Sequence, residues 1–186
     1  MQVNIRFMKA AVIAASNEHT RYYLNGVSVQ SDESNLFYVA TDGTKLVALR
    51  QDHDGTAVNI IIPTDIIAGI KLDRRKGDIG VLTRDGETAW RLEYAGKSII
   101  FAPIDGAFPD WRRVVPREYS GKAAVFNPEI YGSFAKIAKA LGVSPGVVSI
   151  LQNGDGPALI GFGETVDGFG VIMPKRSNTP ALPAWF

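Results

Sequence analysis

The side chains that most often carry catalysis are present in this chain, but their spacing does not suit an active site. His19 and His53 are isolated in the sequence, and no group of residues has the spacing of metal ligands. The Gly-Phe-Gly run at 161–163 is too short for a phosphate-binding loop, and no nucleophile motif occurs. Asp42 and Asp110 lie in turn or linker contexts, where aspartate has a structural role. We therefore expect a protein that is not an enzyme and that holds no metal or cofactor.

Composition indicates a globular protein. Of the 186 residues, 46% are apolar and 21% are charged, and a chain of this length can bury the core of one or two domains. The sequence contains no cysteine, and no apolar run approaches the roughly 18 residues that a membrane span needs. We expect a cytoplasmic protein with no membrane partner. The net charge is +1, so any contact with nucleic acid depends on the local placement of basic residues.

The stretch from Arg21 to Leu49 predicts three short strands that share one buried face. They are expected at about 22–29, at 36–41 and at 45–49. The Asp42-Gly43 pair tolerates the positive φ angles of a tight hairpin turn between the last two strands. The Asn25-Gly26 pair leaves too few positions for separate strands, so we expect a bulge or bend within the first strand.

The order strand, helix, strand, strand, strand is predicted three times along the chain. In copy one, a strand at 3–6 and a helix at 8–16 precede the three strands just described. Copy two has a strand at 58–62, a helix at 63–71 and strands at 79–83, 88–94 and 98–103. Copy three has a strand at 122–126, a helix and strands at 147–152, 158–162 and 169–173. Asn127 and Pro128 are typical of the start of this last helix, and Gly142 is typical of its end.

These repeats predict an α+β fold and a division of the chain into domains. We expect residues 1–116 to form one domain from copies one and two. Residues 117–176 are then half of a second domain, and residues 104–121 connect the two. Residues 177–186, with the sequence SNTPALPAWF, are expected to be a flexible tail because their prolines exclude regular structure.

Four sequence motifs resemble one known family. They are RYYLNG at 21–26, VATDGTKLVAL at 39–49, FPDWRRVVP at 108–116 and GVIMPKR at 170–176. In this order they are similar to the bacterial sliding clamp, the beta subunit of DNA polymerase III. The resemblance implies the DNA clamp fold, in which two strand–helix–three-strand units form a domain, with helices lining a central hole and sheets outside. Copies one and two match the middle domain of the clamp, and copy three matches the closing half of the last domain.

The resemblance implies a processivity factor that tethers a polymerase or repair protein to double-stranded DNA without reading its sequence. Such a protein contacts phosphates through basic side chains. Candidates on or next to the three helices are Lys9, Lys71, Arg74, Arg75, Lys76, Lys136 and Lys139. Each of them could instead be an ordinary solvated charge. A clamp loader is a further expected partner. Since the chain has half the units of a clamp subunit, a closed ring would need a homo-oligomer of four chains.

The second implied site is a pocket for the peptides of partner proteins. Matching motif positions assigns to it Arg21, Leu24, Thr41, Gly43, Leu46, Asn127, Val171, Met173 and Pro174. An apolar floor, an adaptable methionine and a glycine that admits a backbone suit a peptide groove. Leu24, Leu46 and Val171 could instead be core residues. Thr44, Lys45 and Lys175 depart from the family pattern and are expected to alter which peptides bind.

Two alternatives remain open at this stage. The chain could be a clamp-derived interaction module that binds clamp-binding peptides, or regulates a host clamp, without encircling DNA. The end of the tail, 182–186 (LPAWF), loosely resembles a clamp-binding peptide and could occupy the pocket of its own chain or of a neighbour. The alternative for the tail is disorder. Arg112 and Arg113 are expected to hold the linker in place, with Trp111 packed beside them.

Overall fold

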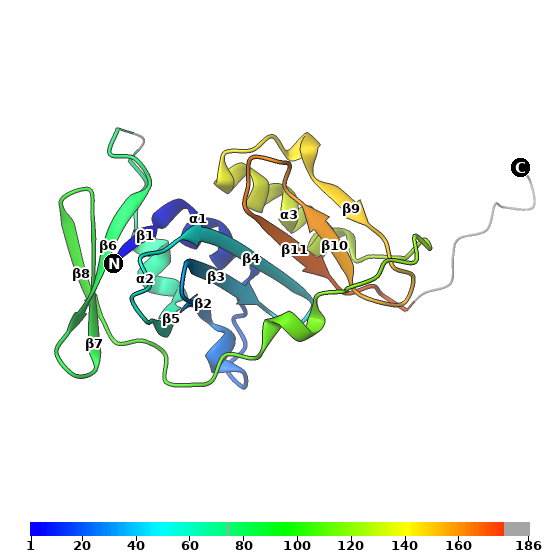
Figure 1. Cartoon of the computed structure of the whole chain (residues 1–186). Helices are drawn as coiled ribbons and strands as arrows, with labels where there is room; N and C mark the ends of the chain where they lie inside the picture. Colours follow the sequence, from blue (N-terminus) through cyan, green and yellow to red (C-terminus); the bar gives the residue numbers. More distant parts are fainter. Residues whose placement is uncertain (74, 177–186) are drawn as a thin grey trace, which may run out of the picture.

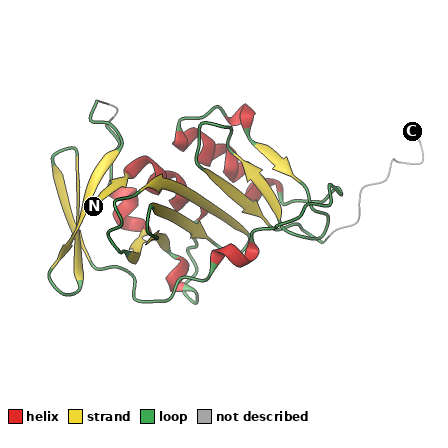
Figure 2. Cartoon of the chain, in the orientation of Figure 1, coloured by secondary structure: helices red, strands yellow, loops and turns green. Residues whose placement is uncertain are grey.

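The protein has an α+β fold, seen in a computed structural model that describes residues 1–73 and 75–176. Figures 1 and 2 show two antiparallel sheets. The four-stranded sheet has the order β1-β6-β7-β8, and the seven-stranded sheet has the order β5-β2-β3-β4-β11-β10-β9. The strands are β1 (Gln2–Asn4), β2 (Gly26–Ser31), β3 (Asn35–Thr41), β4 (Lys45–Asp52), β5 (Asn59–Pro63), β6 (Ile79–Asp85), β7 (Ala89–Tyr94), β8 (Lys97–Phe101), β9 (Ser149–Leu151), β10 (Ala158–Gly161) and β11 (Gly168–Ile172).

The helices of the described residues are short except for the last. They are α1 (Ile5–Ala11), α2 (Thr64–Gly69) and α3 (Pro128–Leu141), with the 3₁₀ helices η1 (Val12–Ala14), η2 (Tyr22–Leu24), η3 (Trp111–Val114) and η4 (Pro145–Val147). Helix α3 begins and ends where the sequence predicts. The Asn127 side chain accepts a hydrogen bond from the Glu129 amide (2.9 Å), Pro128 is the first helical residue, and Gly142 ends the helix with φ +82°.

Copies one and two exchange their first strands. Strand β1 of copy one pairs with β6 of copy two, and Val3 lies opposite Gly80. Strand β5 of copy two pairs with β2 of copy one, and Ile62 lies opposite Val27. Each copy therefore completes the sheet of the other, which ties residues 1–103 into one reciprocal unit.

Copy three extends the sheet of copy one. Strand β11 pairs with β4, with Val171 opposite Leu46 and Phe169 opposite Ala48. Figure 1 shows β9 to β11 continuing the sheet beyond β4, with α3 behind them. Segments that the predicted domain division assigns to different domains thus share one sheet. The division at residue 116 itself remains a prediction.

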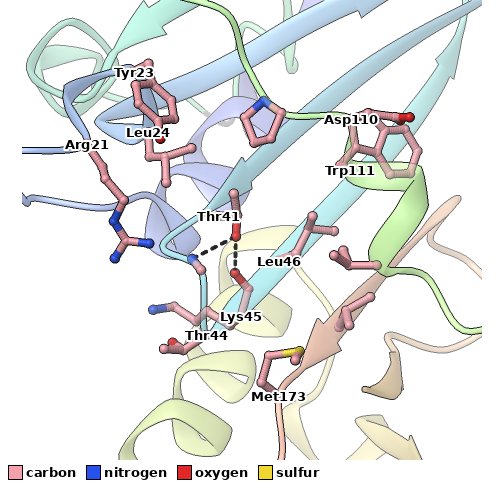
Figure 3. Close-up of a pocket in the computed structure, with 14 residues that line it drawn as sticks. Arg21, Tyr23, Leu24, Thr41, Thr44, Lys45, Leu46, Asp110, Trp111 and Met173 are labelled. Carbon is pink, nitrogen blue, oxygen red and sulfur yellow. Dashed lines mark hydrogen bonds between the residues drawn. The ribbon is translucent and has the colours of Figure 1, made fainter. Parts of the chain in front are cut away.

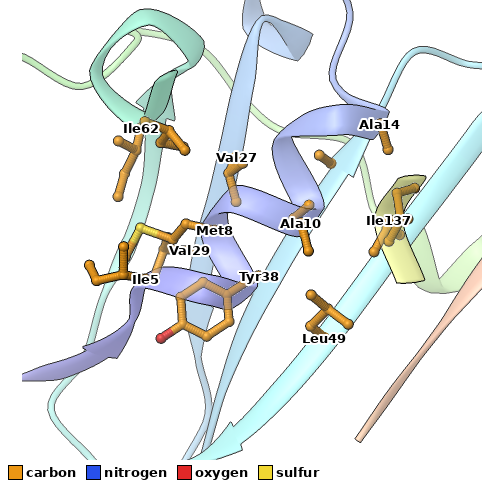
Figure 4. Packing of buried hydrophobic residues seen from close by; sticks show 14 of the residues in the cluster. Ile5, Met8, Ala10, Ala14, Val27, Val29, Tyr38, Leu49, Ile62 and Ile137 are labelled. Atoms are coloured by element: carbon orange, nitrogen blue, oxygen red, sulfur yellow. The ribbon is translucent and has the colours of Figure 1, made fainter. Parts of the chain in front are cut away.

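Alternate side chains of the seven-stranded sheet point to opposite faces, and both faces are covered. We call one the helix face, since α1, α2 and α3 pack there. It includes Tyr38, Val47 and Ile160, which belong to one continuous core cluster with Ile5, Met8 and Ile137 of the helices. Figure 4 shows α1 lying across this face, with Met8 and Ala10 directed toward the strands. We call the other the linker face; it carries Val39, Leu46 and Val171 under the chain from Phe108 to Val115.

Two predicted strand segments are wrong. Residues Tyr22–Leu24 form the 3₁₀ helix η2, and β2 begins only at Gly26. Upstream of Gly26 the ladders of β2 offer no strand partner, so the Leu24 amide bonds locally to the Arg21 carbonyl (2.9 Å). Residues 122–126 form no strand either, because no described strand lies beside them to complete a ladder.

Candidate functional site

A pocket of about 250 Å³ opens on the linker face, where the β3–β4 hairpin, β11 and the linker meet. Figure 3 shows Arg21 and Trp111 on opposite sides of this pocket, with Leu46 between them and Met173 at its lower edge. Its lining consists of Arg21, Tyr23, Leu24, Thr41, Gly43, Thr44, Lys45, Leu46, Pro109, Asp110, Trp111, Val114, Val171 and Met173. Seven of the nine residues predicted for the peptide pocket are in this set.

The floor of the pocket is part of the sheet core. Leu46 and Val171 lie opposite each other on β4 and β11, and only 3% and 2% of their surfaces are exposed. Leu24, at the end of η2, is also buried. These three are therefore core residues, and the little surface that they leave exposed lines the pocket. Met173 is different because 42% of its surface is exposed, so it is free to adapt its side chain at the edge.

The β3–β4 turn is held by side-chain bonds to its own backbone. The Thr41 hydroxyl donates to the Lys45 carbonyl (2.7 Å) and accepts from the Gly43 amide (3.0 Å). Asp42 accepts from the Thr44 amide (2.8 Å) and forms an ion pair with Lys45. Burial would raise the pKa of the Asp42 carboxyl, but the bonds from Lys45 and Thr44 outweigh it and lower that pKa.

Two cations lie beside this turn. The Arg21 guanidinium is oriented by Glu18, whose carboxylate accepts from Nε (3.0 Å) and Nη2 (2.9 Å). The Lys45 ammonium is oriented by Asp42. Both cations line the apolar pocket, and each is already paired with a carboxylate of its own chain.

The linker supplies the wall that the predicted set lacks. Trp111 is buried against Phe37 and Phe169, with ring centroids 5.8 and 6.2 Å away. The Arg112 guanidinium lies 4.9 Å from the centre of the Phe37 ring on β3 and so holds the linker on the sheet by a cation–π contact. The prediction did not include five residues that line the pocket: Tyr23 and the linker residues Pro109, Asp110, Trp111 and Val114. The FPDWRR motif marked this segment in the sequence, but as a linker rather than as a wall.

Two predicted pocket residues do not line this pocket. Asn127 caps α3 through its bond to Glu129, so it serves the helix. Pro174 follows Met173 but is outside the lining. The carbonyl of Val125 accepts from the Lys175 amide (2.7 Å), so the chain after Pro174 turns toward copy three. Lys45 and Thr44, noted only as departures from the family pattern, do line the pocket.

The basic residues predicted to contact DNA differ in their surroundings. Lys136 and Lys139 are exposed on α3, and Lys71, Arg75 and Lys76 are exposed after α2. Lys9 is partly buried and donates to the carbonyl oxygens of Ile67 (3.1 Å) and Ala68 (3.2 Å) at the end of α2. Burial lowers the pKa of Lys9. Arg74 and the tail 177–186 lie outside the described residues.

Among residues 1–73 and 75–176, no three His, Cys, Asp or Glu side chains come together as metal ligands would. No helix in the same part of the chain has the length and apolar character needed to cross a membrane.

Comparisons with known proteins point to one family. A model of the family described as "DNA polymerase III beta subunit, central domain" matches residues 2–110. The beta sliding clamp of Caulobacter vibrioides (strain NA1000) is 35% identical over 121 residues, which are 61% of this chain and 32% of that protein. The beta sliding clamp of Haemophilus influenzae is 29% identical over 116 residues, which are 60% of this chain and 31% of that protein.

Solved structures show the same fold. The DnaN sliding clamp of Bartonella birtlesii, bound to griselimycin, matches 95% of this chain and 66% of its own with a TM-score of 0.69 and 18% identity. A putative DNA polymerase III beta subunit from Eubacterium rectale matches 96% of this chain and 66% of its own with a TM-score of 0.77 and 10% identity. The chain spans about a third of the length of the curated relatives that it matches. Because the family match covers more than half of its residues, the chain belongs to the family of the DNA polymerase III beta subunit, the bacterial sliding clamp.

Proposed function

We propose that this protein is a non-catalytic, clamp-like processivity factor that holds a polymerase or repair protein on double-stranded DNA. The observation that carries the proposal is the pocket on the linker face. Seven residues that the family resemblance assigns to partner binding converge there, from η2, the β3–β4 hairpin and β11. The pocket needs residues of copy one and of copy three, whose strands β4 and β11 pair with each other.

The chemistry of the pocket defines the ligand it would take. The buried floor of Leu24, Leu46 and Val171 favours apolar side chains. The Arg21 guanidinium also lines the pocket and has N–H donors beyond those paired with Glu18, which favours a carboxylate nearby. A short peptide segment that ends in a leucine and an aromatic residue, with an acidic group beside them, fits both requirements.

The opposite face of the molecule would meet DNA. The helices lie on the helix face, away from the pocket, and Lys136 and Lys139 project from α3 into solvent. Basic side chains on these helices would contact phosphates without base readout, so the two partners would occupy opposite faces and bind together.

Two measurements test the proposal. Fluorescence anisotropy with a labelled leucine–aromatic peptide should show saturable binding that Leu46→Glu abolishes, because the carboxylate would be placed against an apolar floor. Retention on circular nicked DNA should exceed retention on the same DNA after linearisation, since a tether that encloses the duplex is lost from free ends. A protein that binds neither the peptide nor DNA would contradict the proposal.

The interaction-module alternative has one observation in its favour, namely that described residues of a single chain line the pocket without a second subunit. The same two measurements separate the alternatives. Peptide binding without any retention on circular DNA would favour a module that competes with or regulates a host clamp. Peptide binding together with retention that linearisation abolishes would favour the processivity factor.

A further inference from the structure

The first strands of copies one and two show how a unit of this fold is completed. Met1 and Leu82 exchange two backbone hydrogen bonds, each of 2.9 Å, so the strand that opens copy one adds to the outer edge of β6 in copy two. In the reverse direction, β5 of copy two adds to the outer edge of β2 in copy one. Each copy gives one strand and receives one.

Residues 122–126 of copy three are held in the same place as these first strands. Two positions before the N-cap of each helix, a carbonyl accepts a bond from the chain that closes its own copy. In copy two, Ile61 accepts from the Ile104 amide (2.9 Å), and in copy three Val125 accepts from the Lys175 amide (2.7 Å). In copy one, Gln2 accepts from the Gln51 side chain (3.2 Å). One edge of the segment is thus engaged as in the other copies.

The other edge of this segment has no strand beside it among the described residues. The Ala124 amide, which occupies the position of Met1, donates instead to the side chain of Gln152 (2.7 Å). The outer edge of β9, which corresponds to the edges of β2 and β6 that receive a strand, is also unpaired within residues 1–73 and 75–176. Copy three therefore has a segment, 122–126, that could pair as a strand, and an open strand edge on β9. Neither is paired with another strand within the described residues.

The side chains at this site show the same incompleteness. Four equivalent positions are buried in copies one and two, where the opposite copy covers them, and are only partly covered in copy three. At one such position on the helix, Met8 of copy one and Ile67 of copy two have no exposed surface. The equivalent residue of copy three, Tyr131, is 38% exposed. The full sets are Val3, Met8, Val27 and Val29 in copy one, Ile62, Ile67, Gly80 and Leu82 in copy two, and Phe126, Tyr131, Val148 and Ile150 in copy three.

We propose that copy three is completed by copy three of a second chain, in a two-fold symmetric dimer. Residues 122–126 of each chain add to the β9 edge of the other, as β1 and β5 do within one chain. The register follows from the existing ladders, in which Gln2 lies opposite Val81 and Ile61 opposite Ser28. Val125 of one chain would then lie opposite Ser149 of the other, and Gln152 would release the Ala124 amide to Ile150 of the second chain.

A second copy is the occupant that the observations favour because the exposed surface is self-complementary. A surface that offers one strand and one strand-accepting edge can satisfy an identical surface around a two-fold axis. Both ladders form at once, which removes two unpaired sheet edges and covers the apolar side chains of both chains. Any other partner would have to supply both a strand and an edge in this geometry.

Disulfide trapping tests the register directly, because the sequence contains no cysteine. Gln2 and Val81 form a non-hydrogen-bonded pair, and residues so paired have Cα atoms about 4.5 Å apart, within reach of a disulfide. Mixing Val125→Cys chains with Ser149→Cys chains under oxidation should give a reducible species of twice the 20.1 kDa chain mass. Either variant oxidised alone should stay at the single-chain mass in denaturing gels, since each cysteine would face a serine or a valine.

Light scattering of the full chain, without oxidant, gives the independent measurement. We expect at least twice the chain mass, and four times that mass if two such dimers close a ring. Tyr131→Glu should weaken the copy-three contact by at least about tenfold because it buries a charge there. Leu151→Glu is the matched control: Leu151 is 53% exposed on the same β9 strand but lies next to Ile150 and so faces the opposite side of the sheet. It should remain dimeric, and circular dichroism would establish that both variants are folded.

Three outcomes would overturn the proposal. The first is a monomer at all concentrations up to the millimolar range. The second is a dimer in which Leu151→Glu disrupts association and Tyr131→Glu does not. The third is a monomer that dimerises only after removal of residues 177–186, which would assign the exposed face of copy three to the tail.

Discussion

Arg21 lies so close to Gly43 that a β-carbon on the glycine would stand 2.6 Å from one guanidinium nitrogen. Gly43 is also the residue of the β3–β4 turn with φ +91°, a conformation that side chains rarely adopt. One position therefore serves two purposes. It allows the turn to close, and it leaves room for the cation that stands at the rim of the pocket.

Replacing this glycine should affect both stability and binding. We expect Gly43→Ala to lower the free energy of unfolding by about 1–2 kcal/mol through its positive φ, and to displace Arg21 because the guanidinium can move more easily than the turn. Urea denaturation and peptide anisotropy measure the two effects. Gly69→Ala is the matched control, since no atom lies within 4 Å of its added β-carbon and its φ is not positive. It should be neutral or slightly stabilising; an equal loss in both variants would contradict the explanation.

Met173 offers a test of the pocket that leaves the core intact. The side chain lines the pocket and is 42% exposed, so Met173→Ala removes ligand contact without opening a cavity in the core. We expect peptide affinity to fall by about three- to tenfold, with a change in unfolding free energy below about 0.5 kcal/mol. Leu151→Ala, an exposed change on β9 outside the pocket, should leave peptide affinity unchanged. Equal loss of affinity in both variants would show that the peptide binds elsewhere.

Sequence predicts those elements whose signals are local. Helix α3 begins and ends as expected because Asn127, Pro128 and Gly142 act within one turn of the chain. The Asp42-Gly43 turn is correct for the same reason, and Gly43 has the positive φ, +91°, that such a turn requires. Seven of the nine residues predicted for the peptide pocket line the pocket on the linker face, because the family motifs that carry them lie in strands and turns that meet there.

Elements that depend on distant partners could not be predicted in the same way. Residues 122–126 have the composition of a strand, but a strand needs a neighbour, and none lies beside them within the described chain. The alternation of Tyr22 and Leu24 looks like a strand until the pairing of β2 is seen to begin at Gly26. The linker wall at Trp111 depends on contacts with Phe37 and Phe169, which lie far away in sequence.

The Asp42–Lys45 pair predicts a pH dependence with a definite sign. The pKa of the Asp42 carboxyl is lower in the folded protein than the value of about 3.9 expected when unfolded. The stabilisation that the ionised carboxylate supplies is therefore present above about pH 4 and is lost as the pH falls through the folded pKa. We expect Asp42→Asn to cost about 1–3 kcal/mol of unfolding free energy at pH 7, and the gap from the unmodified protein to close in acid.

Chemical denaturation between pH 7 and pH 3 measures this gap. Asp155→Asn is the control, because Asp155 is an exposed carboxylate in the loop between β9 and β10. It should change the unfolding free energy at pH 7 by less than about 0.5 kcal/mol. A gap for Asp42→Asn that stays constant down to pH 3 would mean that the charge of Asp42 does not stabilise the turn.

The basic residues of the helix face should separate into structural and DNA-contacting groups. Lys9 donates to the last carbonyls of α2, where a cation also complements the helix dipole, so Lys9→Met should lower the unfolding free energy by about 1 kcal/mol. Lys136 and Lys139 are exposed on α3, so Lys136→Met and Lys139→Met should each change it by less than about 0.5 kcal/mol.

For DNA binding we expect the opposite order: the two α3 variants should have an effect and Lys9→Met should not. Each lost phosphate contact reduces the slope of log affinity against log salt by about 0.9, so we expect this change for Lys136→Met and Lys139→Met but not for Lys9→Met. Titrations of a short duplex at several salt concentrations provide the slopes. If Lys9→Met reduced the slope as much as the two α3 variants, the ammonium of Lys9 would have to leave the end of α2 for a phosphate when DNA binds. Its stabilising contact would then belong only to the free protein.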